Sequence, residues 1–408
     1  MPSGMDHILS DLRVLDFTRA LAGPSCTRMM AEMGADVIKV ESGPRGDMVR
    51  GISVFDEKER SLYFIQQNLG KKSLCVNIRD PKAMEIIKEL VAQMDVVVEN
   101  FKPGVMAKMG LGYDDLKKIK PDIILCSISA LGQSGPLSNK PGYDYIAQAY
   151  SGVTAMIGDP DEAPYIPGVG MGDVSTGVHG ALAVVSALRY RDRTGKGQHL
   201  DIGLLDVYYH YHEVNVHQYS GTQGKMQPSR SGRHLSYVCP AGVFRAKKGS
   251  VVIMAFLHHW KDLCAAMEKP ELVEHERYCN DVLRLQNRTE VVQIIEDWLM
   301  ETFTDASSAV AHMEEFGVPV APVLSVAETT QHPHLRERGT VRTIADPIAG
   351  KFDIPGMPLR FSLFPEDLPL QAPTLGQQNE FILTEYLKRS PEEVQKLRDS
   401  GVLYEKDS

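Results

Sequence analysis

One carboxylate near the middle of the chain is surrounded by small residues, in the segment Gly170-Met-Gly-Asp173-Val-Ser-Thr-Gly177. Glycines let a ligand approach the backbone closely, because they carry no side chain. A helix beginning here would offer free N–H groups to a developing negative charge. Asp173 could therefore be a catalytic group. It could equally be an N-cap whose carboxylate accepts hydrogen bonds from the first helical N–H groups.

Other motifs that could carry chemistry are weaker. Histidines cluster at 210–217 as HYHEVNVH, but His210 and His212 are two positions apart and would not share a helix face. The HExxH frame of zinc proteases is missing, as are GxGxxG, GxxxxGK[ST] and GxSxG. We therefore expect neither a metal nor a prosthetic group.

Basic residues gather in the first third of the chain, where loops should follow strands: Lys71, Lys72, Arg79, Lys102 and Lys108. They are either solvated surface charges or a site for phosphate groups. The formal charge of the chain is −9, from 44 Lys and Arg against 53 Asp and Glu. This acidic balance argues against a general nucleic-acid or anionic-membrane binder, while a local basic pocket stays compatible with it.

The elements that would position these residues follow a strand–helix alternation. Residues 12–17 predict a strand, a helix follows from 24 to about 33, and Gly34 ends it before a second strand at 36–40. Further strands are predicted at 74–78, 96–98, 123–128 and 198–202, with a helix at about 80–94. The alternation predicts a large, Rossmann-like, doubly wound α/β domain with a parallel sheet.

The pattern changes after residue 178. Helices are predicted at 179–190 and at 205 to about 219, an extended crossing at 319–323 and a charged helix from 381. We assign domains from these signals as follows: residues 1–204 form a large domain, 205–236 a linker, 237–320 a smaller α/β domain, and 321–408 a linker and a return to the large domain.

Composition fits an ordinary globular enzyme, with 43% hydrophobic and 24% charged residues in 408. The six cysteines form no CxxC pair, so we expect reduced, buried thiols. The N-terminus has no apolar signal segment, and no apolar run is long enough to span a bilayer. We therefore expect a cytoplasmic protein that does not bind membranes.

Segments along nearly the whole chain, in the right order, resemble the family III CoA-transferases, also called the CaiB/BaiF family. LRVLDFTRALAGPSCTRMMAEMGADVIKVESGPRGDMVRG (12–51) is similar to the N-terminal signature of that family. The other similar segments are DVVVENFKPGVMAKMGLGYDDL (95–116, CoA binding), ALGQSGPLSNKPGYDYIAQA (130–149, a mobile catalytic loop), GDVSTG (172–177), RTGKGQHLDIGLLD (193–206), APVLSVAETTQHPHLRERG (321–339) and LGQQNEFIL (375–383).

The resemblance implies an enzyme that moves CoA from an acyl-CoA to a carboxylic acid, with Asp173 as nucleophile. Its carboxylate would attack the thioester to give a mixed anhydride, and CoA thiolate would then form an aspartyl-CoA thioester. Asp173 must be ionised for this, and we expect its helix-terminal setting to favour the ion. The resemblance also implies that the smaller domain is inserted and that two subunits interlock like rings, as a homodimer or with a paralogous subunit.

The resemblance further implies the binding residues. For CoA they are Arg79 and Lys108 at the phosphates, Asn100, Phe101 and Met109 near the adenosine, Ala20 beside the pantetheine arm, and Val76 as a further contact. Leu21 and Tyr143 would contact the acyl substrate. The predicted cations suit a ligand rich in phosphate.

The sequence departs from the formyl-CoA:oxalate enzymes of the family at three places. Leu21 replaces their glutamine near the nucleophile, Ser42 replaces an arginine that contacts CoA, and residues 225–245 lack their tetraglycine loop. Oxalate is therefore not expected as acceptor. Leu21 favours a larger, more apolar acyl group, and we predict a succinyl-CoA-dependent enzyme acting on a dicarboxylic or aromatic acid such as benzylsuccinate.

Two alternatives stay open at this point. An α-methylacyl-CoA racemase would have the same fold but uses the histidine of a Gly-His-Asp motif as a base, where this chain has Gly142-Tyr143-Asp144. Tyrosine, with a pKa of about 10, is a poor base at neutral pH. The chain could also be a CoA-binding subunit of a hetero-oligomeric transferase, although Asp173 argues for the active partner.

Overall fold

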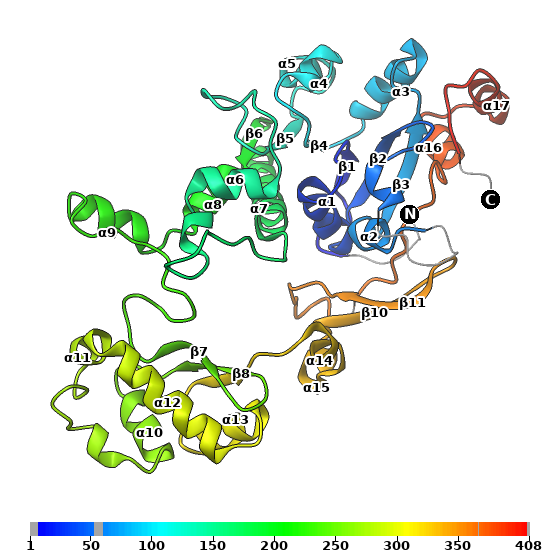
Figure 1. The fold of residues 1–408 in the computed structure, drawn as a ribbon. Coiled ribbons are helices and arrows are strands. Elements are labelled where there is room, and N and C mark those ends of the chain that lie inside the picture. Colours follow the sequence, from blue (N-terminus) through cyan, green and yellow to red (C-terminus); the bar gives the residue numbers. More distant parts are fainter. Residues whose placement is uncertain (1–6, 53–59, 366, 406–408) are drawn as a thin grey trace. The chain divides into compact units, whose positions relative to one another are not determined.

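The computed structural model describes residues 7–52, 60–365 and 367–405, shown as a ribbon in Figure 1. These residues fall into two compact units. The first takes its residues from 1–151, 167–212 and 334–408, and the second from 152–166 and 213–333. The segment 152–166, which the sequence analysis did not separate from the large domain, thus belongs to the second unit.

A six-stranded parallel sheet organises the first unit (Figure 1). Its strands are β1 (Arg13–Asp16), β2 (Asp36–Ser42), β3 (Lys71–Val76), β4 (Val96–Glu99), β5 (Ile124–Ser129) and β6 (His199–Gly203). The strand order is β3-β2-β1-β4-β5-β6, so the winding reverses between β1 and β4. In open parallel sheets, ligands bind at this reversal, beyond the carboxyl ends of the strands. The predicted α/β class and parallel sheet are confirmed.

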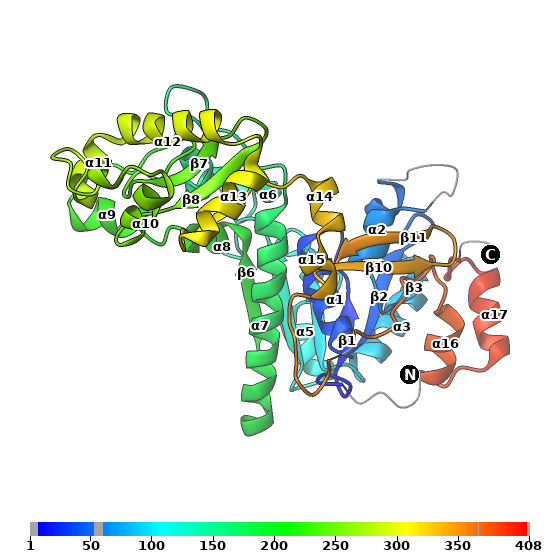
Figure 2. The ribbon, with the colours of Figure 1, turned by 90° about the horizontal axis from the view of Figure 1, so that it is seen from below.

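Ten α-helices lie entirely within the described part of the first unit. They are α1 (Ala22–Glu32), α2 (Leu62–Gln67), α3 (Pro81–Val91), α4 (Val105–Lys108), α5 (Tyr113–Ile119), α6 (Asp144–Ser151), α7 (Met171–Thr194), α8 (Leu204–His210), α16 (Asn379–Glu385) and α17 (Pro391–Asp399). An antiparallel hairpin of β10 (Val341–Asp346) and β11 (Gly350–Pro355) lies against α2, because Ile344 and Ile354 pack on Phe64 (Figure 2).

Helix α7, which carries Asp173, is longer at both ends than the predicted helix at 179–190. Its first turns contain Gly172, Gly177 and Gly180, which disfavour a helix by about 1 kcal/mol each. Packing explains the difference. A Cβ at Gly177 would lie 2.6 Å from Ser25 Cβ and 2.8 Å from Ala22 O, so only glycine lets α1 approach α7 this closely.

The second unit has its own core around a three-stranded antiparallel sheet of β7 (Ala241–Arg245), β8 (Ser250–Met254) and β9 (Val320–Pro322). The predicted extended segment at 319–323 contains β9. The helices are α9 (Asn215–Gly221), α10 (His259–Ala266), α11 (Asp281–Gln286), α12 (Arg288–Thr302), α13 (Ala306–Glu315) and α14 (Val326–Gln331); α15 (Pro333–Glu337) follows at the return to the first unit. Arg230 joins the two parts of this unit by donating to the carbonyls of Ala155, Asp159 and Glu162.

Two expectations are wrong in detail. The helix predicted from 205 to about 219 is interrupted between His210 and Asn215, in a stretch of Tyr, His and Val that are weak helix formers. Cys279 is exposed, whereas the other five cysteines are buried as expected. Within the described residues, no helix is long and apolar enough to cross a membrane.

Candidate active site

Asp173 is the third residue of α7, near the carboxyl edge of the sheet in the first unit. Gly170 is the N-cap and no side chain caps the helix, so the N-cap interpretation of Asp173 is wrong. Burial raises the pKa of the Asp173 carboxyl to about 7, and the nearby charge of Asp144 adds to this. Burial and the like charge of Asp144 act against the ion that the helix end was expected to favour.

The glycines around Asp173 make room for protein neighbours. A Cβ at Gly172 would lie 2.1 Å from Tyr208 Cε2 and 2.4 Å from Asp144 Oδ1. A Cβ at Gly170 would lie 2.9 Å from Leu21 Cδ2. Together with Gly177 against α1, these contacts explain the small residues of the segment. Leu21 is thereby placed at the start of the helix that carries Asp173.

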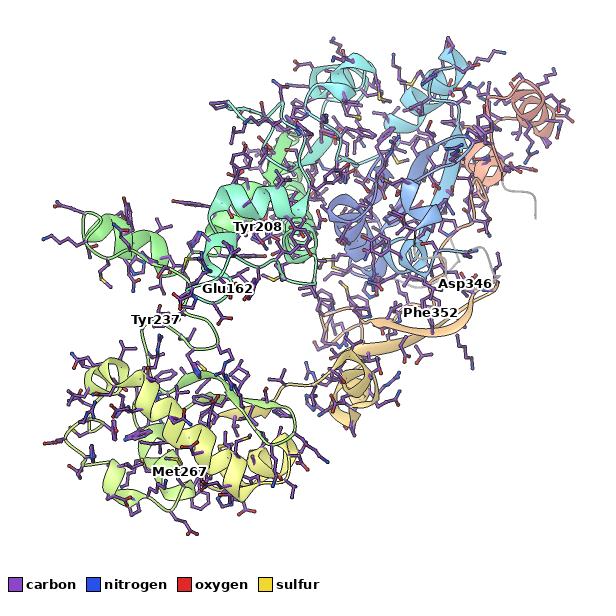
Figure 3. The ribbon with its side chains drawn as sticks, viewed as in Figure 1. Glu162, Tyr208, Tyr237, Met267, Asp346 and Phe352 are labelled. Carbon is purple, nitrogen blue, oxygen red and sulfur yellow. The ribbon has the colours of Figure 1, made fainter. Side chains whose placement is uncertain are left out.

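Asp144 and Tyr208 brace the first turn of this helix. The Tyr208 hydroxyl, labelled on α8 in Figure 3, donates to Asp144 Oδ1 and accepts from the Gly172 N–H at 3.0 Å. It also accepts from Gln148 Nε2 at 3.2 Å. Asp144 is only 7% exposed, and its Oδ2 has no hydrogen-bond partner in the described structure. The negative charge that acts on Asp173 is thus held in a fixed place.

Tyr63 on α2 is a further neighbour of the nucleophile candidate. Burial raises the pKa of its hydroxyl to about 12, and the charges of Asp173 and Asp47 contribute. Tyr63 therefore stays protonated at neutral pH and can donate a hydrogen bond near the Asp173 carboxylate.

The turn between β1 and α1, which carries Ala20 and Leu21, rests on a buried ion pair. Lys39 Nζ lies 3.0 Å from Asp47 Oδ2 and donates to Thr18 O, while the Ala20 N–H donates to Asp47 Oδ1 at 3.3 Å. Ala20 has φ +62°, a conformation that costs energy for any residue with a side chain. The Lys39–Asp47 ion pair thus binds this strained turn at Thr18 and at Ala20, and so positions Leu21.

The residues expected to bind CoA lie beyond the carboxyl ends of β1, β3 and β4. Arg79 and Lys108 are exposed, and neither has an ion-pair partner among the described residues. Asn100 is hydrogen-bonded to the backbone of Arg19, and Phe101 lies beneath the Arg19 guanidinium. Met109 packs partly against the core, while Val76 is fully buried, which leaves its side chain no surface for a ligand.

Tyr143 directly precedes Asp144 at the start of α6. Its side chain is 78% exposed, whereas Asp144 is buried. Sequence reasoning missed Asp144, Tyr208 and Tyr63. The Gly-Tyr-Asp motif could have indicated Asp144, but Tyr208 and Tyr63 sit in aromatic helical stretches that look like core. Within the described ranges, no group of three His, Cys, Asp or Glu could hold a metal ion.

The chain is similar to proteins of one known family over most of its length. The model of CoA-transferase family III matches residues 9–379. The chain belongs to this family. A mouse protein named succinyl-CoA:glutarate CoA-transferase is 37% identical over 398 residues, which cover 97% of this chain and 90% of the mouse protein. A Haloarcula hispanica protein named succinyl-CoA:mesaconate CoA-transferase is 38% identical over 390 residues, covering 92% and 96% of the two chains.

Solved structures agree with this assignment. The crystal structure of a CaiB/BaiF family protein from Brucella suis superposes with a TM-score of 0.83 at 31% identity, covering 94% of this chain and 100% of that one. The family resemblance inferred from the sequence is confirmed. This family III member is a CoA-transferase, whose substrates are CoA thioesters and carboxylic acids.

Proposed function

We propose that this family III CoA-transferase moves CoA from succinyl-CoA to a small aliphatic dicarboxylate, with Asp173 as nucleophile. The observation that carries the proposal is the environment of Asp173: a partly buried carboxylate at the start of α7, close to a second carboxylate, with a pKa raised to about 7. Such a group is partly ionised at neutral pH and poorly stabilised as an anion, which suits a nucleophile.

The proposed reaction passes through covalent intermediates on Asp173. Asp173 attacks the thioester carbonyl of succinyl-CoA, and the C–S bond breaks to release CoA thiolate and leave a mixed anhydride. The thiolate attacks the aspartyl carbonyl, succinate leaves, and Asp173 becomes a CoA thioester. The acceptor carboxylate attacks this thioester, which expels CoA thiolate and leaves a mixed anhydride between the acceptor and Asp173. The thiolate then attacks the acceptor carbonyl of this anhydride, giving the acceptor CoA ester and the free Asp173 carboxylate. The Tyr63 hydroxyl is suited to donate to carbonyl oxygens that become negative in these steps.

The choice of substrates rests on two supports. The mouse and Haloarcula relatives are both named for succinyl-CoA and for a dicarboxylate, glutarate or mesaconate. The chain also has Gly142-Tyr143-Asp144 where a racemase would have the histidine that acts as a base. The first support favours an aliphatic dicarboxylate over benzylsuccinate, and the second favours a transferase over a racemase.

We further propose two interlocked subunits, with the domain boundaries at 204, 236 and 320, and with CoA over the large domain. An apolar stripe on α7 supports a subunit contact: Val174, Val178, Leu182 and Val185 are exposed at helical spacing. Light scattering should give twice the mass of the 45.2 kDa chain. A monomer that is active at assay concentration would contradict this arrangement.

The decisive experiment separates nucleophile from acceptor. The enzyme is incubated with succinyl-CoA and glutarate, mesaconate, benzylsuccinate or oxalate, and the CoA esters are identified by mass spectrometry. Without acceptor, hydroxylamine or borohydride should modify a peptide containing residues 170–177. Asp173→Ala should lose both transfer and labelling. Full transfer by Asp173→Ala would refute the mechanism, and transfer only to benzylsuccinate or oxalate would refute the acceptor.

A further inference from the structure

We propose that Arg19 is a binding residue for the diphosphate of CoA, a role that rests on the proposed function and that the sequence analysis did not assign. Arg19 follows β1 and Asn100 follows β4. These are the two neighbouring strands between which the sheet reverses its winding. Arg19 therefore stands in the crevice where open parallel sheets bind their ligands.

The backbone of Arg19 is fixed across this crevice. Its N–H donates to Asn100 Oδ1 at 2.8 Å, and its carbonyl accepts from Asn100 Nδ2 at 2.8 Å. This reciprocal pair joins the loop after β1 to the loop after β4. The residue after Arg19 is Ala20, which the Asp47 carboxylate and Lys39 hold in place. The backbone of this loop is already ordered, so binding a ligand does not have to pay for ordering it.

The guanidinium of Arg19 is held but not neutralised. Its Cζ lies 5.1 Å from the centroid of the Phe101 ring, a cation–π contact that leaves the N–H groups free. The side chain is exposed, and no carboxylate of a described residue lies within ion-pair distance of it. Two half-buried arginines of the same unit differ: Arg50 pairs with Glu41, and Arg60 with Asp346. A fixed, unpaired guanidinium is the group that recognises phosphate oxygens in a bidentate way.

The position of Arg19 selects the diphosphate rather than another part of CoA. On one side is Ala20, expected beside the pantetheine arm. On the other are Asn100 and Phe101, expected near the adenosine. The diphosphate joins those two parts of CoA, so a cation between them faces it. Ser42, where the formyl-CoA:oxalate enzymes are expected to have an arginine, is the last residue of β2, which pairs with β1. Arg19 supplies a guanidinium on the loop after β1.

The test compares three donors in steady-state assays with saturating acceptor: succinyl-CoA, succinyl-dephospho-CoA, which keeps the diphosphate, and succinyl-pantetheine, which lacks it. Arg19→Ala should raise the KM of the first two about ten- to a hundred-fold. It should leave kcat, the KM of the acceptor and the KM of succinyl-pantetheine unchanged. Arg19→Lys should recover part of the loss. The matched control is Arg193→Ala, an exposed arginine at the other end of α7.

Three results would overturn the inference. An equal KM increase with succinyl-pantetheine would mean that Arg19 only supports the loop. Loss of the effect with succinyl-dephospho-CoA would assign Arg19 to the 3′-phosphate, and unchanged KM values would remove it from the site. If the wild type transfers CoA to no acid, the proposed function fails instead. Calorimetric binding of CoA, dephospho-CoA and pantetheine to wild type, Arg19→Ala and Arg19→Gln then tests Arg19 without turnover, with the same expected order.

Discussion

Asp16 and Asp173 are two shielded carboxylates of the same unit in opposite electrostatic surroundings. Asp16 is fully buried, yet it lies 3.1 Å from Lys71 Nζ and accepts a hydrogen bond from Thr27 at 2.7 Å. Burial alone would raise its pKa, but the charges of Lys71 and Lys39 and the threonine hydroxyls hold the pKa of Asp16 below its usual value. Asp173 has no such partner among the described residues, and burial with the charge of Asp144 raises its pKa to about 7.

The difference bears on which carboxylate we propose as the nucleophile. Lysines close to Asp16 stabilise its anion, and that stabilisation would be lost if the group formed an ester. In the proposed mechanism Asp173 becomes uncharged as an anhydride and as a thioester, so a lysine beside it would favour the starting state over the transition state. In the first unit the buried Lys39 and Lys71 pair with Asp47 and Asp16, whereas no cation of a described residue pairs with Asp173.

The largest expected effect on stability comes from Asp16→Asn. The substitution leaves Lys71 buried without its counter-charge, and we expect unfolding to become easier by about 3–5 kcal/mol. Because the folded pKa of Asp16 is lowered, its contribution is complete above the unfolded pKa and is lost as the pH falls through the folded value. Urea unfolding should show that the wild type is much more stable than Asp16→Asn at pH 7, and that this difference is smaller at pH 3. Equal free energies of unfolding for the two proteins at pH 7 would show that the lysines do not need Asp16.

A smaller effect of opposite sign is expected from Asp173→Asn. The folded pKa of about 7 lies above the usual 3.8, so ionisation destabilises the folded state. The free energy of unfolding of the variant should exceed that of the wild type by about 1–3 kcal/mol at pH 8. The difference is no larger because water still reaches the partly buried carboxylate. The gain should grow from about pH 4 to pH 7 and disappear below pH 4. Loss of stability at pH 8 would mean that the anion has a partner.

The sequence predicted part of the structure around Asp16 and Asp173. Apolar strands alternating with helices were enough for the parallel sheet. The small residues around Asp173 singled it out as a candidate, and the family resemblance alone gave it the role of nucleophile. Those residues also misled, because Gly172 and Gly177 make room for Tyr208 and for α1 rather than for a ligand. A one-dimensional pattern shows that space is needed, but not what fills it.

The remaining features depend on residues far apart in the chain. The pKa of Asp173 depends on Asp144, and the β1–α1 turn depends on Lys39 and Asp47. Tyr208 and Tyr63 look like core aromatics in their own segments, and only the fold places their hydroxyls at the site. Local sequence gives the position of the helix end, but not the burial that raises the pKa of the Asp173 carboxyl.

The pH dependence of transfer tests whether ionisation of Asp173 controls the reaction. If Asp173 attacks as an anion, kcat/KM should rise with pH through a midpoint of about 7. Asp144→Asn removes the like charge but keeps an oxygen that can accept from Tyr208. We expect the midpoint to fall by up to about one pH unit. A kcat/KM that does not change between pH 5 and 8 would show that the reaction does not depend on the ionisation of Asp173.

The smallest effect is expected from Tyr208→Phe, which tests whether the first turn of α7 is braced from outside. The substitution removes the hydroxyl that donates to Asp144 and accepts from the Gly172 N–H, one residue before Asp173. The aromatic ring remains and keeps filling the space at Gly172, so the helix should stay in place. Loss of a buried hydrogen bond should make unfolding easier by about 1–2 kcal/mol.

Activity separates bracing from packing in this variant. Asp144 and the Gly172 N–H lose their common partner, so the carboxylate that acts on Asp173 becomes less fixed. We expect kcat to fall about tenfold, since a small displacement of a nucleophile is costly, while the KM of succinyl-CoA stays unchanged. Tyr209→Phe is the matched control, because Tyr209 is the next residue of α8 and is exposed. If Tyr208→Phe keeps the full kcat while losing stability, Tyr208 supports the fold and not the reaction.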